Sequence, residues 1–332
     1  MARHRSERRA HEVNARGEFG LIARIRARAA TRGDVILGIG DDAALLQVPP
    51  GKLLVVATDT LNSGVHFPED TAPADIGWKA LAVNLSDLAA MGAQPAWCTL
   101  SLSLPDADMA WLDGFLGGFM ELANRHCIAL VGGDTTRGPL SICVTALGVV
   151  NPEHVPRRDA AQLGDDIWIT GTLGDAAAGL AQWKSRHSNA DPLLRQRLDR
   201  PTPRIDAGLG LAGLAHACID VSDGLLADLG HVCAASGAGA EIRADALPSS
   251  TALQSVFDQA EQRRMLQLSG GDDYELCFSA STQARDAIAD VAERCGVTMT
   301  RIGRIVEGEG VRILLGDGRE WISPDIGYRH FT

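Results

Sequence analysis

The sequence predicts a two-domain protein in which strands and helices alternate, so its fold class is α/β or α+β. Its 332 residues amount to about two domains of average length. Apolar, β-branched runs alternate with helix-like stretches in both halves of the chain. Between the halves, residues 151–166 are polar and rich in turn formers, which is typical of a domain boundary.

The first half is predicted to contain three helices and three strands. Leu21, Ile22 and Ile25 form an apolar stripe that predicts a helix over residues 18–30. A second helix is bounded by Asp75 at its N-terminal end and by Gly92 just after its C-terminal end. A third helix is expected over residues 111–125, and strands over residues 52–57, 127–131 and 141–150. The basic segment 1–16 is expected to be a poorly packed tail.

The second half repeats the alternation. Strands are expected over residues 166–170 and 274–279, and a further strand is expected to end at residues 218–220. Helices are expected over residues 173–184 and from residues 224–235, and a hairpin over residues 298–315. The run Arg-Pro-Thr-Pro-Arg at 200–204 predicts extended backbone. A GxGxxG pattern at 208–213 follows this run rather than a strand. It therefore predicts a helix with small packing residues, and not a dinucleotide site.

Composition excludes several classes of protein. Apolar residues make up 45% and charged residues 22%, as in ordinary globular domains. No apolar run approaches the ~18 residues of a membrane span, and the Arg-rich start lacks the apolar core of a secretory signal. The seven cysteines lack the spacing of a disulfide framework or a zinc site. This cysteine usage predicts a cytoplasmic location.

Charge argues against nucleic acid as a partner. The net charge is −11, and the residues after position 32 carry 22 basic and 39 acidic side chains. Only three lysines occur in the chain. If the protein binds phosphates, their charge must be balanced by metal ions, arginines or backbone N–H groups.

Aspartate recurs at the ends of strands and in tight turns. It does so in residues 38–43, 58–60, 132–136, 220–224 and 269–275, and Asn84 and Asp87 share one helix face. Each segment alone has an ordinary explanation as a turn or helix cap. If the carboxylates converge, they need a counter-charge, and hard oxygen ligands select Mg²⁺, Mn²⁺ or Ca²⁺. The pattern therefore favours a nucleotide or polyphosphate site bridged by metals.

Other chemistry-bearing residues are less informative. No Ser-His-Asp or Cys-His set can be identified, and there is no GxxxxGK[ST] loop, so any ATP is bound by another architecture. His66 follows Asp59 in a glycine-containing loop and is either a structural or a ligand-binding histidine. Several cysteines lie in apolar runs and are expected in the core: Cys98, Cys127, Cys143, Cys218 and Cys277.

Nine motifs resemble those of the thiamine-monophosphate kinase family. They are GIGDDAALL (38–46), TDTLNSGVHF (58–67), WKALAVNLSDLAAMGA (78–93), GGDTTRGPL (132–140), ITGTLGDAAAGL (169–180), RPTPR (200–204), IDVSDGLLADL (219–229), SGGDDYELCF (269–278) and GYRHF (327–331). The resemblance runs in order from residue 17 to residue 331. The family belongs to the superfamily of aminoimidazole ribonucleotide (AIR) synthetase, selenophosphate synthetase and HypE. The TDT…GVHF run, GGDDYEL and the terminal GYxHF separate it from these relatives.

The resemblance implies ATP-dependent phosphorylation of thiamine monophosphate to thiamine diphosphate, with several Mg²⁺ ions. The metal ligands that it implies are Asp42, Thr58, Asp59, Asp87, Asp134, Asp220 and Asp223, with Ala57 contributing its backbone. The implied ATP contacts are Gly133, Asp134, Arg158 and Ser222, and the implied substrate contacts are His66, Asp272 and Tyr328. This chain departs from the family at Asp272, where Glu is common, and at Asn62-Ser63, where Val-Glu is common.

The resemblance also implies an AIR synthetase-like fold in a homodimer. Residues 17–151 would form an α/β domain whose strands pair across the dimer into a β-barrel, and residues 152–332 an α+β domain. Two other functions remain open: a sister synthetase that activates a carbonyl or selenide, and a non-catalytic nucleotide-binding regulator. The chain lacks the reactive N-terminal Cys or selenocysteine loop expected of selenophosphate synthetase.

Overall fold

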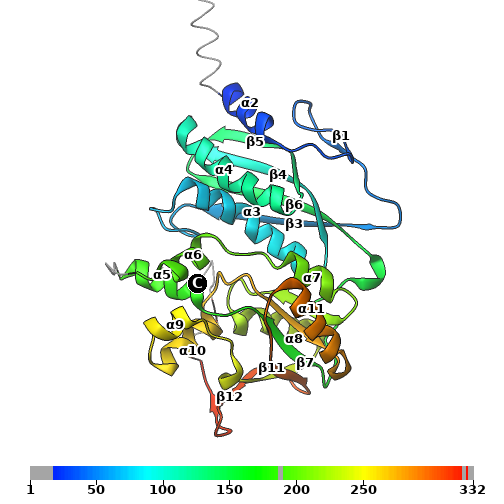
Figure 1. Cartoon of the computed structure of the whole chain (residues 1–332), viewed down its shortest axis with the longest axis vertical. Helices are drawn as coiled ribbons and strands as arrows, with labels where there is room; N and C mark the ends of the chain where they lie inside the picture. Colours follow the sequence, from blue (N-terminus) through cyan, green and yellow to red (C-terminus); the bar gives the residue numbers. More distant parts are fainter. Residues whose placement is uncertain (1–17, 186–189, 324–326, 328–332) are drawn as a thin grey trace, which may run out of the picture. The chain divides into compact units, whose positions relative to one another are not determined.

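The computed structural model describes residues 18–185, 190–323 and 327, and it divides into two compact units (Figure 1). The first unit contains the chain up to Asn84 together with Pro95–Val149. The second contains Leu85–Gln94 and the chain from Val150 onward. Within the described ranges, no helix is long and apolar enough to cross a membrane.

The first unit has a four-stranded sheet in the order β3–β6–β4–β5, in which β4 and β5 run parallel. A separate two-stranded ribbon joins β1 to β2. All helices and strands expected between residues 18 and 150 are present. Their bounds are α2 Glu18–Arg28, β1 Val35–Leu37, β2 Leu45–Leu46, β3 Leu53–Asn62, α3 Pro73–Ala90, β4 Gln94–Leu104, α4 Met109–Arg125, β5 Ala129–Arg137 and β6 Ser141–Val150.

Helices α3 and α4 approach each other closely because glycine faces backbone on both sides. A Cβ on Gly77 of α3 would overlap the carbonyl oxygen of Phe115, and a Cβ on Gly118 of α4 would overlap that of Ala74. Helix α4 starts at Asp108, whose carboxylate accepts the N–H groups of the helix's first turn. This close packing holds the part of α3 that ends at Asn84 against the rest of the first unit, and the last residues of the helix, which include Asp87, belong to the second unit.

The second unit contains a seven-stranded sheet in the order β13–β12–β9–β11–β7–β10–β8. Its strands are β7 Asp166–Thr170, β8 Ala215–Asp220, β9 Gly239–Arg243, β10 Leu276–Ala280, β11 Met299–Val306, β12 Gly310–Leu314 and β13 Glu320–Trp321. Its helices are α5 Asp175–Lys184, α6 Pro192–Asp199, α7 Ile205–Leu211, α8 Leu225–Ser236, α9 Thr251–Val256, α10 Ala260–Ser269 and α11 Arg285–Cys295. Three short 3₁₀ helices cover Pro152–His154, Ala244–Ala246 and Thr282–Ala284.

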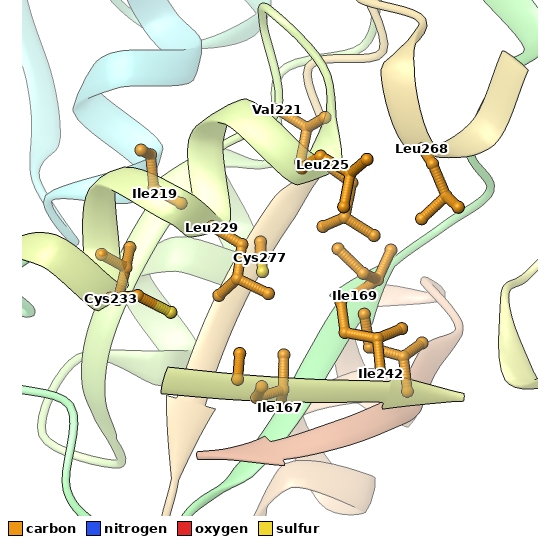
Figure 2. Packing of buried hydrophobic residues seen from close by; sticks show 14 of the residues in the cluster. Ile167, Ile169, Ile219, Val221, Leu225, Leu229, Cys233, Ile242, Leu268 and Cys277 are labelled. Atoms are coloured by element: carbon orange, nitrogen blue, oxygen red, sulfur yellow. The ribbon is translucent and has the colours of Figure 1, made fainter. Parts of the chain in front are cut away.

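The core of the second unit lies between α8 and the sheet (Figure 2). Leu225, Leu229 and Cys233 follow one another at four-residue spacing along α8, and each is buried. They pack with Ile169 of β7 and Cys277 of β10 in one cluster. This apolar stripe fixes where α8 begins, directly after the aspartate-containing segment that follows β8.

The hairpin expected over residues 298–315 is wrong. Strands β11 and β12 form there, but β9 lies between them. β9 pairs antiparallel with β11 and parallel with β12. A Cβ on Gly239 would lie 3.3 Å from the backbone of Gly308, so a side chain there would crowd the β11–β12 connection. Pairing both edges of the largely buried strand β9 is favoured over a simple hairpin, which would leave an edge of β9 open.

The expectation of a buried Cys127 is also wrong, and Cys143 is only half-buried, although all seven cysteines are free. Cys127 is exposed and has a left-handed backbone with φ of 52°. It follows the end of α4, where the N–H of Ile128 donates to the carbonyl oxygen of Ala123 at 3.0 Å. This is the hydrogen bond of a Schellman motif, which requires that conformation. The end of the helix, not the apolar run, decides the position of this cysteine.

The GxGxxG pattern has the structural role expected of it. Residues Ile205–Leu211 form α7, and a Cβ on Gly208 would overlap the carbonyl oxygen of Ala89. Gly210 likewise faces the side chain of Val291 on α11. These glycines allow close packing, and the described residues directly before them, α6 and residues 200–204, contain no strand that could build a dinucleotide site.

Candidate functional site

The first unit contains a cavity of about 740 Å³ beside β4 and β5. Its lining comes from α2, from residues 38–44 and from the glycine-containing part of β5. Three residues predicted from the sequence line it: Asp42, Gly133 and Asp134. Ile22 and Ile25 of α2 add an apolar wall. Such a lining suits a ligand that has both an ionic and an apolar part.

Gly133 allows β5 to pass close to β4 beside this cavity. Its φ is +146°, and a Cβ would overlap the carbonyl oxygen of Leu100, so a side chain is excluded. The next residue, Asp134, is exposed, and its Oδ1 accepts the N–H of Thr135 at 2.9 Å. The N–H of Asp42 is held by the Asp41 carboxylate at 3.0 Å. The backbone of Asp42 is thus held by its neighbour, and the carboxylate of Asp134 is oriented by the N–H that follows it, while both residues line the cavity.

Strand β3 carries Thr58 and Asp59, and a residue of α3 holds the backbone of Asp59. The fully buried Asn84 accepts the N–H of Asp59 through Oδ1 at 3.1 Å. The Nδ2 of Asn84 donates to the carbonyl oxygen of Ala80 at 3.1 Å, which fixes the orientation of the amide. The hydroxyl of Thr58 donates to Thr145 on β6 at 2.9 Å. Asn84 therefore supports Asp59 indirectly, a role that the sequence does not reveal.

Two hydrogen bonds between His66 and Asn62 close a tight loop. The N–H of Asn62 donates to Nδ1 of His66 at 3.0 Å, and the N–H of His66 donates to the carbonyl oxygen of Asn62 at 3.1 Å. Because Nδ1 accepts a hydrogen bond, the neutral ring carries its proton on Nε2. The half-buried ring therefore offers Nε2–H as a donor.

In the second unit, the segments 220–224 and 269–275 lie side by side. The N–H of Asp272 donates to the carbonyl oxygen of Ser222 at 2.8 Å. This bond joins a residue predicted to contact ATP to one predicted to contact the substrate. Two further backbone bonds continue the pairing of β8 with β10: Val221 donates to Glu275 at 2.8 Å and Tyr274 donates to Val221 at 2.9 Å.

Glycines permit this close approach. A Cβ on Gly271 would overlap the carbonyl oxygen of Ser222. Gly224 has a φ of +121°, and its Cβ position lies 3.0 Å from the backbone of Ser269. The glycines of both motifs are therefore required because backbone meets backbone at these points.

A buried carboxylate organises the segment 222–224. Oδ2 of Asp228 accepts the N–H groups of Ser222, Asp223 and Gly224 at 3.0, 3.1 and 3.1 Å. Burial, followed by the negative charges of Asp220 and Asp223, raises the pKa of Asp228 to about 7. The charges of Asp220 and Asp223 are therefore both felt at the carboxyl group of Asp228.

The predicted substrate residue Asp272 is held in an unusual backbone conformation. Asp272 and Tyr274 have φ values of 67° and 50°, which side-chain-bearing residues rarely adopt. The hydroxyl of Tyr274 donates to Oδ1 of Asp272 at 3.0 Å. Left-handed backbone in residues that are not glycine is concentrated at functional sites.

Behind this segment lies a buried ionic cluster around Glu275, which is fully buried. Arg197 donates to Oε1 of Glu275 at 2.7 Å, and Arg204 donates to both of its oxygens at 2.5 and 2.6 Å. The Thr170 hydroxyl adds a bond of 2.7 Å. The second arginine of RPTPR thus anchors the end of the aspartate-containing segment through two parallel hydrogen bonds.

Asp273 is the buried neighbour of Asp272. Its Oδ2 accepts the N–H of Gly174 at 2.8 Å, and its Oδ1 has no hydrogen-bond partner within the described part of the chain. Burial raises its pKa well above the usual range for a carboxyl group. Asp273 therefore keeps its proton to a higher pH in the fold than in the unfolded chain.

For the remaining predicted residues, Asp87, Arg158 and Tyr328, the structure gives fewer contacts that bear on the site. The hydroxyl of Ser86, next to Asp87, donates to Oδ2 of Asp220 at 2.7 Å, which brings the end of α3 to Asp220. Arg158 is exposed, and its carbonyl oxygen accepts the hydroxyl of Ser236 at 2.9 Å. Tyr328 lies outside the described residues. Across the ranges that the structure covers, no group of three or more His, Cys, Asp or Glu is arranged to hold a metal ion.

Sequence reasoning did not single out Asp228, Asp273 or Arg197. For Asp228 a signal was present, because an acidic residue stands between Leu225 and Leu229 on the apolar face of a helix. For Asp273 and Arg197 the signal lies only in the three-dimensional contacts.

Both units match known protein families. The N-terminal domain of AIR synthase related proteins matches residues 40–150, and the C-terminal domain of these proteins matches residues 162–316. A curated relative, the thiamine-monophosphate kinase of Salmonella typhimurium, is 47% identical over 323 residues, which cover 95% of this chain and 98% of the relative. The thiamine-monophosphate kinase of Escherichia coli K12 is 47% identical over 322 residues with the same coverage.

Solved structures agree with these relatives. The thiamine-monophosphate kinase from Stenotrophomonas maltophilia K279a has a TM-score of 0.85 and 56% identity, covering 92% of this chain and 98% of its own. A second structure, AaThiL complexed with AMPPCP and TMP, has a TM-score of 0.74 and 35% identity, covering 95% and 97%.

Proposed function

Because the chain belongs to the family of thiamine-monophosphate kinases, among the AIR synthase related proteins, we propose that it phosphorylates thiamine monophosphate with ATP to give thiamine diphosphate. The observation in this chain that carries the proposal is the hydrogen bond between Asp272 and Ser222. It joins a segment predicted for substrate to a segment predicted for ATP and metal. The neighbour that binds AMPPCP and TMP supports the same pair of ligands.

The reaction is a direct in-line transfer of the γ-phosphoryl group. The phosphate of thiamine monophosphate has a second pKa of about 6, so near pH 7 it is mostly a dianion. It therefore needs no strong general base, and we assign none. The main barrier is electrostatic, because two unit charges of the same sign ~4 Å apart repel by about 4 kcal/mol at an effective dielectric constant of 20.

Several Mg²⁺ ions would supply the positive charge that offsets this repulsion, and the oxygen-bearing side chains predicted as ligands suit Mg²⁺. Carboxylate and hydroxyl oxygens are hard ligands, which Mg²⁺ prefers. Burial is the main cause of the raised pKa of Asp228, and the charges of Asp220 and Asp223 raise it further, so negative charge is concentrated where a cation would relieve it. The residues that would hold the ions are Asp42, Thr58, Asp59, Asp87, Asp134, Asp220 and Asp223. When bound, Mg²⁺ neutralises phosphate charge and aligns the attacking and leaving oxygens.

The chain's own residues bind and orient the two ligands. Gly133 and Asp134 line the cavity of the first unit, which suits ATP. Ser222 uses its hydroxyl, because its N–H and carbonyl groups are already hydrogen-bonded. The exposed Arg158 is suited to stabilise the transferred phosphoryl group through its planar guanidinium.

The substrate thiazolium carries a positive charge. The carboxylate of Asp272 is complementary to it, and the Nε2–H of His66 is suited to donate to an acceptor atom of the substrate. Tyr328, which the sequence predicts at this site, would contribute a cation–π contact.

A homodimer is supported by the apolar edge of the first unit. β3 is an edge strand of its sheet, and Leu53, Leu54 and Val56 on it are 52%, 43% and 57% exposed. An exposed apolar edge strand is a ready partner for a second copy of the chain, and such pairing is the first step toward a dimeric β-barrel. Seven free cysteines support a cytoplasmic location.

One assay tests the proposed function. The purified protein is incubated with ATP, Mg²⁺ and thiamine monophosphate, and the products are separated. We expect thiamine diphosphate and ADP in equal amounts. ADP without thiamine diphosphate would instead indicate a sister synthetase, and nucleotide binding without turnover a regulator.

A further inference from the structure

The N–H groups that precede α8 are occupied by a side chain of the same helix. Three successive residues, Ser222, Asp223 and Gly224, donate to the single oxygen Oδ2 of Asp228. Successive N–H groups that converge on one point form the kind of concavity with which proteins bind anions such as phosphate. Here a side-chain oxygen of the chain itself fills that position, and Asp228 is only 3% exposed.

This arrangement differs from an ordinary helix cap. A cap residue precedes the helix and accepts N–H groups of its first turn. The residue at that position is Gly224, which has no side chain and a φ of +121°. Asp228 instead lies inside α8 and reaches back to N–H groups that precede the helix. It therefore fixes the segment before the helix rather than the helix end.

The other backbone groups of this segment are also committed. The carbonyl oxygen of Ser222 accepts the N–H of Asp272, and that of Val221 accepts the N–H of Tyr274. Asp228 thus fixes one side of the segment while the residues that follow Gly271 fix the other. What remains to face a ligand are the half-buried side chains of Ser222 and Asp223.

We propose that Asp228 is a positioning residue for phosphoryl transfer. By filling the concavity before α8, it keeps ATP phosphate away from these N–H groups and holds Ser222 and Asp223 so that their side chains meet the ligands. The proposal rests on the proposed function, since it takes Ser222 and Asp223 as ligand-binding residues.

The test compares Asp228→Asn with a matched control, Asp165→Asn. Asp165 is equally buried at 3%. Its carboxylate also accepts a backbone N–H, that of Gln162 at 3.0 Å, and it bonds Ser279 and His216. None of these partners belongs to the predicted site, so the control measures the cost of neutralising a buried carboxylate of this unit.

Hydrogen exchange gives a readout that does not depend on activity. In the unliganded wild type we expect slow exchange at the amides of residues 222–224. The amide oxygen of Asp228→Asn is uncharged and holds three N–H groups less strongly than a carboxylate oxygen does. In this variant the exchange should therefore accelerate at least tenfold, and in Asp165→Asn it should stay within twofold of wild type. If Asp228→Asn does not fold, the wild-type measurement still decides, because fast exchange of these amides in the wild type overturns the proposal.

Kinetics separate positioning from loss of folded enzyme. A smaller folded fraction lowers kcat and leaves KM unchanged. For Asp228→Asn we expect kcat to fall at least tenfold and the KM for ATP to rise at least fivefold. A fall in kcat with an unchanged KM for ATP would overturn the proposal that Asp228 is a positioning residue. Equal effects in Asp165→Asn would also overturn it. Wild-type protein that makes no thiamine diphosphate would refute the proposed function, while hydrogen exchange would still report whether Asp228 holds the segment.

Discussion

The backbone N–H of Asp272 donates to the carbonyl oxygen of Ser222 at 2.8 Å, although fifty positions separate the two residues in the sequence. The bond continues the antiparallel pairing of β10 with β8 beyond the ends of both strands. Sheet pairing is rigid, so a displacement of one segment is transmitted to the other. The residues predicted for substrate and for ATP are thus parts of one structural element.

Gly271→Ala tests this coupling. The new Cβ would overlap the carbonyl oxygen of Ser222, so the two segments must separate. We expect kcat/KM to fall at least tenfold for both ATP and thiamine monophosphate, measured by steady-state kinetics. The control is Gly230→Ala on α8, where a Cβ meets nothing within 4 Å. There, Ala should stabilise the helix by about 0.5–1 kcal/mol and leave activity unchanged. Wild-type kinetics in Gly271→Ala would contradict the coupling.

Tyr274→Phe tests the role of Asp272 in substrate binding. The variant removes only the hydroxyl that donates to Oδ1 of Asp272 at 3.0 Å. Losing one such hydrogen bond should lower the free energy of unfolding by about 0.5–1.5 kcal/mol. A less restrained Asp272 should raise the KM for thiamine monophosphate about three- to tenfold and leave the KM for ATP unchanged. An equal rise in both would remove Asp272 from the substrate site.

The helices and strands that could be predicted correctly from the sequence are those that a local pattern determines. β6 and β7 have the predicted bounds, Ser141–Val150 and Asp166–Thr170, because their apolar residues and flanking turns are contiguous in sequence. The order of strands is not local. Placing β9 between β11 and β12 depends on which strand is paired on both edges, and the turn residues near Gly308 and Gly310 carry no information about that.

The candidate site also contains residues that the local sequence pattern predicts and residues that only the folded structure shows. The recurrence of aspartate beside glycine identified the segments that carry Asp134, Ser222 and Asp272. It did not identify what holds them. Asn84 bonds the backbone of Asp59 and Arg204 bonds Glu275, and both contacts span dozens of residues of sequence. Such supports become visible only when the chain is folded, because nothing in the local pattern distinguishes them from ordinary buried or basic residues.

Asp273 should make the protein less stable as pH rises. Its pKa in the fold is raised, chiefly by burial. Between the ordinary carboxyl pKa and the raised value, the folded protein keeps a proton that the unfolded chain has released. The free energy of unfolding therefore falls as pH increases through this window. In Asp273→Asn the amide oxygen can still accept the N–H of Gly174, and this slope should be smaller. Urea unfolding from pH 5 to pH 8 measures it; parallel curves for the two proteins would rule out the effect.

Asp59→Asn tests the metal role on β3. The variant keeps the size of the side chain and the N–H that Asn84 accepts, so the free energy of unfolding should change by less than ~1 kcal/mol. Turnover should fall at least a hundredfold, because a carboxylate that balances cation charge is lost. The exposed Asp106→Asn removes one charge from the loop before α4 and should retain wild-type turnover. Full activity in Asp59→Asn would refute the metal assignment.

Val56→Asp tests whether β3 is the dimer interface. Val56 is 57% exposed on the edge strand β3, beside Leu53 and Leu54. We expect the wild type to sediment at twice the chain mass of 35.1 kDa. A charge at Val56 would have to be desolvated between two apolar surfaces, so the variant should sediment as a monomer. The control is Ile322→Asp, which changes an apolar residue that is 84% exposed in the other unit and should remain dimeric. A dimeric Val56→Asp protein would place the interface elsewhere.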